Sequence, residues 1–279
     1  MRSFLALLLF GSAMMTAAPA GSEVQWKGLD NGRFELRVAG KPVLVYNSGM
    51  ELAKGAPENR RRCCYVHPLY APNGVVVTDD FPKDHWHHRG VFWSWPVVNY
   101  GGKKYDLWMH FETGIKRWTV SVKHDRIDLT AVNGWFIGEK QIVRERVRIH
   151  PEAAGKVRFD LEWEALAGPV EIAGAPEDNK GYGGFSIRFA PRVDTVIRSD
   201  RGDEPKDTDA VQHRWAELEA RYANANGRAA VRIEDATDNN TWCVRHYGFL
   251  GVNFPGLQGY TLEPGKPVQK TYTVTVTAK

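Results

Sequence analysis

The chain has 279 residues, of which 43% are hydrophobic, and its 37 basic and 33 acidic side chains leave a formal charge of +4. The two signs are mixed along the sequence, without a basic run of the kind that binds nucleic acid, so we expect no nucleic-acid partner. The length is enough for one substantial hydrophobic core, and the composition leaves open an enzyme, a binding protein or a structural protein.

The N-terminus predicts a secretory signal peptide over residues 1–20. Arg2 precedes the short apolar run Phe4–Phe10, and the small-residue segment Ala18–Ala20 marks the expected cleavage point. The alternative is a membrane anchor, but the apolar run is too short to span a bilayer and no later segment reaches that length. We therefore expect a secreted or periplasmic protein with a single domain over residues 21–279 and no membrane span in it.

Most of the remaining chain alternates between apolar and polar residues, the pattern of β-strands with one buried face. Two segments rich in glycine and charge, 174–183 and 199–209, predict long loops. Only Val211, Trp215, Leu218 and Tyr222 have helical spacing. We therefore predict an all-β fold, an antiparallel β-sandwich. The alternating segments are 34–38, 43–46, 118–122, 127–131, 157–163 and 272–277.

Candidate catalytic residues concentrate between His67 and Gly90, a stretch with four of the nine histidines. Imidazole titrates near neutrality and is the commonest metal ligand. If residues 84–89 form a strand, His85 and His87 share one face and can act as an acid/base pair, with Asp84 as orienter. His67 can lean back onto this cluster across the turn at Asn73-Gly74. The catalytic candidates are His85, His87, Asp84 and His67.

The same two-residue spacing would also suit two ligands of a divalent metal, so His85 and His87 are the metal candidates. A third ligand would have to come from elsewhere in the chain. The alternative without function is that these histidines stiffen a surface turn.

Substrate-binding candidates surround the cluster in sequence or share its residue types. The ten tryptophans can stack on the apolar faces of sugar rings, although each taken alone can equally fill the core. An arginine can hold a substrate oxygen, and the glycine-rich entry 181–184 permits close approach by a ligand. The candidates are Arg89, His88, Trp86, Trp95, Tyr182, Arg188 and His246.

Three cysteines leave their redox state open. Cys63 and Cys64 are adjacent, and Cys243 is distant in sequence. In an oxidising compartment one of the pair could bridge to Cys243, and free buried thiols are the alternative.

The sequence resembles the PmoA-like family of exported bacterial proteins, often labelled methane oxygenase. The resemblance rests on His67-Pro68, Asp84-His85-Trp86-His87-His88-Arg89-Gly90, Trp95, Gly184–Phe189 and His246-Tyr247-Gly248. It implies a galactose-mutarotase-like β-supersandwich and, by analogy of fold, a role on carbohydrates. A membrane monooxygenase subunit would need several apolar spans, which this sequence lacks after residue 20.

We therefore expect an exported carbohydrate-active enzyme, a hydrolase, lyase or epimerase acting on a sugar or glycoside. Cleavage of a glycosidic bond or epimerisation requires a proton donor and an acceptor, which residues 67–89 can supply. One alternative is a non-catalytic carbohydrate-binding protein that uses the same aromatic cleft. A third is a structural envelope protein whose histidines merely bind metal.

Overall fold

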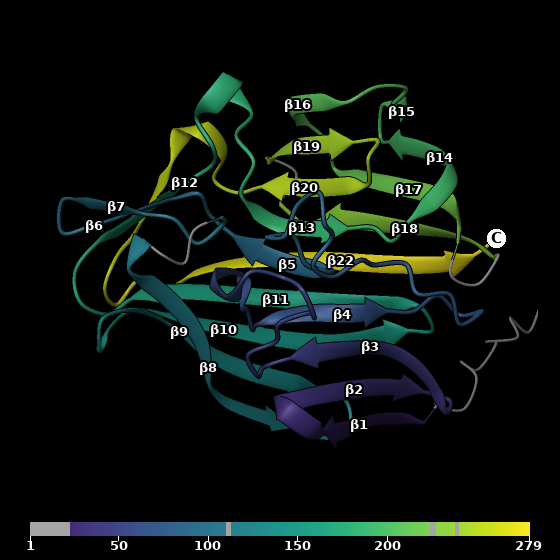
Figure 1. The fold of residues 1–279 in the computed structure, drawn as a ribbon, viewed down its shortest axis with the longest axis horizontal. Helices are drawn as coiled ribbons and strands as arrows, with labels where there is room; N and C mark the ends of the chain where they lie inside the picture. Colours follow the sequence, from purple (N-terminus) through teal and green to yellow (C-terminus); the bar gives the residue numbers. More distant parts are fainter. Residues whose placement is uncertain (1–22, 110–112, 224–226, 238–239) are drawn as a thin grey trace, which may run out of the picture.

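The computed structural model describes residues 23–109, 113–223, 227–237 and 240–279, so the predicted signal peptide, residues 1–20, lies outside the described residues. Within these ranges the strands form two nine-stranded sheets and one four-stranded sheet, with antiparallel pairing throughout the ladders (Figure 1). The predicted antiparallel β-sandwich is confirmed. No helix in the described ranges is both long enough and apolar enough to cross a membrane.

The first large sheet, called sheet 1, has nine strands. In spatial order its strands are β1 (Val24–Leu29), β2 (Arg33–Val38), β3 (Lys41–Asn47), β4 (Tyr65–Leu69), β5 (Val91–Ser94), β13 (Gly184–Arg188), β20 (Phe249–Asn253), β19 (Thr241–Arg245) and β16 (Thr208–Gln212).

The second large sheet, called sheet 2, packs its apolar face against sheet 1. Its strands are β15 (Gly202–Asp203), β14 (Arg192–Ser199), β17 (Trp215–Tyr222), β18 (Gly227–Asp235), β22 (Val268–Ala278), β11 (Lys156–Ala165), β10 (Lys140–Ala153), β9 (Leu129–Ile137) and β8 (Ile115–His124). The small third sheet has β21 (Tyr260–Leu262), β12 (Val170–Ala173), β6 (Val97–Tyr100) and β7 (Lys103–Tyr105). Short 3₁₀ turns are η1 (Asp30–Gly32), η2 (Glu58–Arg60), η4 (Glu177–Asn179) and η5 (Gly256–Gln258).

Strand alternation explains how the two sheets make one core. In β11 every second residue is buried, and Phe159 and Leu161 pair with Ile149 and Val147 of β10. These side chains join one continuous buried cluster with Leu36, Leu44 and Val66 of sheet 1. Each such side chain contributes roughly 1.5–3 kcal/mol when it leaves water.

The helical spacing at residues 211–222 does not produce a helix. The segment forms β16 and β17, and in β17 the buried residues are Ala216, Leu218, Ala220 and Tyr222. The two alanines have little hydrophobic weight in the sequence, so they obscure a period of two that the sheet uses. The loop expected at 174–183 contains only η4, whereas the segment 199–209 includes β15 and the start of β16.

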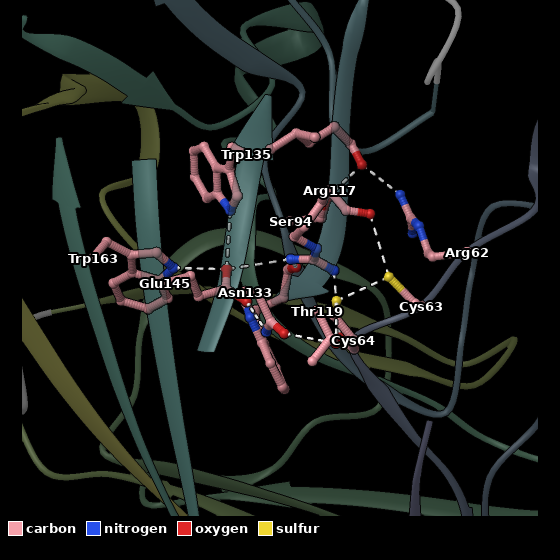
Figure 2. Close-up of polar contacts among 12 residues, drawn as sticks. Arg62, Cys63, Cys64, Ser94, Arg117, Thr119, Asn133, Trp135, Glu145 and Trp163 are labelled. Carbon is pink, nitrogen blue, oxygen red and sulfur yellow. Dashed lines mark hydrogen bonds and ion pairs between the residues drawn. The ribbon is translucent and has the colours of Figure 1, made fainter. Parts of the chain in front are cut away.

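A buried polar network holds the two sheets together (Figure 2). Arg117 of β8 and Glu145 of β10 form an ion pair at 3.5 Å, with 1% and 0% of their side chains exposed. Arg117 also donates to the carbonyl oxygens of Trp93 (2.7 Å) and Cys64 (3.4 Å). Trp93 lies in β5 of sheet 1, and Cys64 immediately precedes β4 of the same sheet. Glu145 in turn accepts hydrogen bonds from Asn133, Trp135 and Trp163 at 2.7, 3.2 and 3.0 Å.

Candidate functional site

The histidine cluster lies on two consecutive turns and not on a strand. The amide of His85 donates to the carbonyl of Pro82 (3.0 Å), and that of His88 donates to the carbonyl of His85 (2.8 Å). The strand geometry considered for residues 84–89 is therefore wrong. The turns instead bring all three rings together, with centroid separations of 5.6 Å for His85–His87, 4.7 Å for His85–His88 and 4.5 Å for His87–His88.

Two buried arginines fix the backbone of this loop. Arg62 donates to the carbonyls of His87 (2.8 Å) and Trp108 (2.9 Å). Arg89 donates to the carbonyls of Trp86 (2.9 Å) and His88 (2.6 Å). The Arg89 side chain is fully buried, and its guanidinium carbon Cζ lies 3.4 Å from the centre of the Phe81 ring. Its guanidinium donates to carbonyl oxygens of the protein itself, and Arg89 is not among the residues that line the cavity described next.

The three imidazoles form one wall of a cavity of about 310 Å³. Tyr247, in the turn between β19 and β20, stacks on His85 at 5.0 Å, and Phe249 stacks on His88 at 5.1 Å. On another side Trp108 and Tyr182 lie 5.1 Å apart. Among the described residues the cavity is lined by His85, His87, His88, Trp108, Met109, Lys180, Tyr182, Cys243, Arg245, Tyr247 and Phe249.

Asp84 is placed to orient His85. Its carboxylate accepts two hydrogen bonds from Arg188 Nη2, at 2.9 and 2.7 Å, and its Oδ2 lies 3.0 Å from His85 Nδ1. This last contact has the distance of an ion pair but not the alignment of a hydrogen bond. Partial burial opposes ionisation of Asp84, but its hydrogen bonds from Arg188 and its close contact with His85 outweigh this effect and lower the pKa of Asp84. Arg188 also lies 4.8 Å from the ring of Tyr247, so it supports the wall from behind.

Burial keeps four other titratable groups of the wall neutral: His87, His88, Tyr182 and Cys243. Desolvation, helped by the cation of Arg62, lowers the pKa of His87 to about 3, and desolvation holds the pKa of His88 well below its usual value. Desolvation raises the pKa of Tyr182 to about 12 and that of Cys243 to about 12. At neutral pH these side chains therefore present uncharged hydrogen-bonding groups.

Several predicted site residues lie elsewhere. The ring of His67 contacts Thr78 Oγ1 at 3.0 Å, and His246 contacts the Glu204 carbonyl at 2.9 Å. Trp95 is fully buried in the main core, where its Nε1 donates to the Phe254 carbonyl (2.6 Å). Trp86 is partly exposed but does not line the cavity. The structure thus unites Asp84, His85, His87, His88, Tyr182 and Arg188, and leaves His67, Trp86, Arg89, Trp95 and His246 outside.

Several residues of the cavity wall were not among the candidates predicted from the sequence. Met109, Lys180, Cys243, Arg245 and Phe249 come from segments far from the histidines along the chain. The sequence signal that could have indicated some of them was the polar segment around Tyr247. This segment lies at the end of a strand pair that joins sheet 1 beside β13. Within the described ranges no group of three or more His, Cys, Asp or Glu side chains is arranged to hold a metal ion. The pair His85 and His87 therefore has no third ligand of these types there.

A protein-family model described as a family of unknown function, DUF6807, matches residues 33–279. No curated protein matches the sequence.

Solved structures with a similar arrangement include a galactose mutarotase-related enzyme from Lactobacillus acidophilus, with 8% identity, 91% of this chain and 97% of that chain covered, and a TM-score of 0.45. An aldose epimerase homologue from C. elegans has 7% identity, with 92% of this chain and 99% of that chain covered, and a TM-score of 0.37. A heparan sulfate lyase from Pedobacter heparinus has 7% identity, with 93% of this chain and 36% of that chain covered, and also a TM-score of 0.37.

Proposed function

This chain belongs to DUF6807, a family of unknown function, and we propose that it is an exported carbohydrate-active enzyme that transforms a sugar or glycoside in the histidine cavity. The observation that carries the proposal is the Asp84–His85 pair at the wall of an aromatic cavity of about 310 Å³. Export rests on the sequence pattern of residues 1–20 alone.

The chemistry follows from the three imidazoles having different surroundings. Asp84 faces Nδ1 of His85, which leaves Nε2 of the same ring to exchange a proton with a ligand. A third of the His85 side chain is exposed, so solvent can return the proton. His87, with its pKa near 3, stays neutral and serves as a hydrogen-bonding group, since so weak a base contributes little to proton transfer at neutral pH.

The aromatic walls favour a polyol ligand. Trp108, Tyr182 and Tyr247 can stack on the apolar faces of a sugar ring, while neutral imidazole and phenol groups can bind its hydroxyls. A hydrolase, a lyase or an epimerase all require the proton transfer assigned to His85.

One observation favours a second candidate, a carbohydrate-binding protein without catalysis. Two of the three imidazoles, His87 and His88, have lowered pKa values and so act as hydrogen-bond partners rather than as bases. In that case aromatic stacking would account for most of the affinity.

The test is to incubate the purified protein with a panel of glycosides and oxidised glycosides, with and without a divalent metal ion, and to measure binding and turnover. For any substrate found, His85→Gln should lower turnover by roughly 10²–10⁴-fold with little change in affinity. The matched control is His67→Gln, which alters a histidine outside the cavity and should leave both unchanged. Affinity without turnover, reduced by Tyr247→Leu and not by His85→Gln, would favour the binding protein. Neither binding nor turnover across the panel would contradict both.

A further inference from the structure

We infer that Cys63 and Cys64 form a redox modification site, in which the two adjacent thiols interconvert with a disulfide between neighbouring residues. This inference concerns the interior between the sheets and is independent of the proposed activity. The two side chains are drawn beside Arg117 in Figure 2.

The two sulfur atoms already lie close together. Cys63 Sγ and Cys64 Sγ are 2.9 Å apart, and both residues are buried, with 1% and 0% exposed. A disulfide bond is about 2.05 Å long, so bond formation requires the sulfurs to approach by only about 0.9 Å. Cys243 offers no such contact, because its Sγ lies on the cavity wall, 3.8 Å from Asp209 Oδ1.

The backbone at Cys64 is held in a conformation that residues with a side chain seldom adopt. Its φ is +65°, in the left-handed region. The conformation is fixed on both sides, because the Cys64 amide donates to the carbonyl of Asn47 (2.7 Å) and the Cys64 carbonyl accepts from Arg117 (3.4 Å). Strain that the surrounding structure imposes in this way is concentrated at functional positions.

A bridge between neighbours should be easily reduced. Consecutive Cα atoms of a trans peptide are about 3.8 Å apart, whereas disulfides normally span about 4.4–6.8 Å between Cα atoms. The resulting strain makes the bond more reducible. We therefore expect a reversible modification and not a permanent structural bridge.

The reaction requires an oxidant, for which a low-molecular-weight disulfide is sufficient. The Cys63 thiol loses its proton, and its sulfur attacks one sulfur of the small disulfide, which breaks that bond and releases the first small thiolate. The Cys64 thiol then loses its proton and attacks Cys63 Sγ, which forms the Cys63–Cys64 bond and releases the second thiolate. The two thiolates take up the two protons, and the two electrons pass from the cysteines to the small disulfide.

The surroundings suit Cys63 to the first attack. The hydrogen bond from the Cys64 thiol, together with the cation of Arg117, lowers the pKa of Cys63, whereas burial raises that of Cys64. The thiolate is the nucleophile in disulfide exchange.

The experiment equilibrates the folded chain in mixtures of reduced and oxidised glutathione. Equilibrium is approached from fully reduced protein and from protein oxidised before refolding, so that slow access to buried thiols does not hide the end point. After acid quenching, denaturation and alkylation with N-ethylmaleimide, mass spectrometry of the tryptic peptide Cys63–Lys83 reports both cysteines. Oxidising mixtures should give a peptide with two hydrogens fewer and no alkylation, and reducing mixtures should restore two alkylated cysteines.

Matched variants locate the bond. Cys243→Ser should leave this transition unchanged, whereas Cys63→Ser should abolish it and leave Cys64 alkylated. The inference is overturned if both cysteines stay alkylated at equilibrium from both directions. It is equally overturned if the oxidised species contains Cys243 or stops at a glutathione adduct.

Discussion

Replacing Glu145 by glutamine would remove the counter-charge of Arg117 while nearly keeping the shape of the side chain, and it would replace one of the two acceptor oxygens with an NH₂ donor that faces either Asn133 or the indole N–H groups of Trp135 and Trp163. The two groups are 3.5 Å apart and fully buried. At an effective dielectric constant of about 20, two unit charges at this distance attract by about 5 kcal/mol. Breaking a buried pair by removing one partner typically costs about 3–5 kcal/mol, because the other charge is left without compensation. We therefore expect Glu145→Gln to lower the free energy of unfolding by about 3–5 kcal/mol.

Urea denaturation followed by far-ultraviolet circular dichroism would measure this change. Adding Arg117→Met to Glu145→Gln should cost clearly less than the sum of the two single changes, because the pair is coupled. The control is Glu162→Gln, which removes a partner of Arg146 at 3.8 Å on the surface and should cost less than about 1 kcal/mol. A loss below about 1 kcal/mol for Glu145→Gln, or full additivity in the double variant, would refute the reasoning.

Two further predictions concern His67 and Gly184. Burial lowers the pKa of His67 from 6.5 to about 4, so the stability it contributes is present above pH 6.5 and is lost as the pH falls through 4. His67→Gln should therefore reduce by roughly 2–3 kcal/mol the loss of unfolding free energy between pH 7 and 4, as measured by urea denaturation. A pH profile identical to that of the wild type would contradict this prediction. Gly184 has a φ of +116°, and a Cβ there would lie 2.6 Å from the Val252 carbonyl oxygen. Gly184→Ala should therefore destabilise by about 2 kcal/mol or more in thermal unfolding, and by more than Gly202→Ala, where φ is +113° but the space is open; equal losses would show that the close contact is unimportant.

Local alternation was enough to predict the sandwich, because the buried residues of a strand such as β11 follow one another at a period of two in the sequence. The same local reasoning placed Asp84 beside His85, which are neighbours in the chain. It could not supply Arg245 and Phe249, which reach the cavity only because β19 and β20 join sheet 1 beside β13.

The misplaced residues have physical explanations of the same kind. A sequence does not distinguish an arginine that binds backbone carbonyls from one that binds a ligand, and Arg89 is the former. Trp95 and the other large aromatic residues look alike in sequence, but its indole is enclosed by Trp135 and Trp163. His67 is near the cluster along the chain, yet its ring is engaged by Thr78.

The two arginines behind the histidine loop have a consequence for the entropy of binding. Arg62 and Arg89 tie the backbone of residues 86–88 to its surroundings, so the loop is ordered before any ligand arrives. A flexible loop would lose roughly 1–2 kcal/mol per residue on becoming ordered around a ligand, and that loss would subtract from affinity. In this protein the loop loses that entropy when the chain folds, and not when a ligand binds. Ligands should therefore be selected by their fit to a fixed outline, with the positions of ring hydroxyls deciding between stereoisomers, and the free and bound proteins should differ little in backbone.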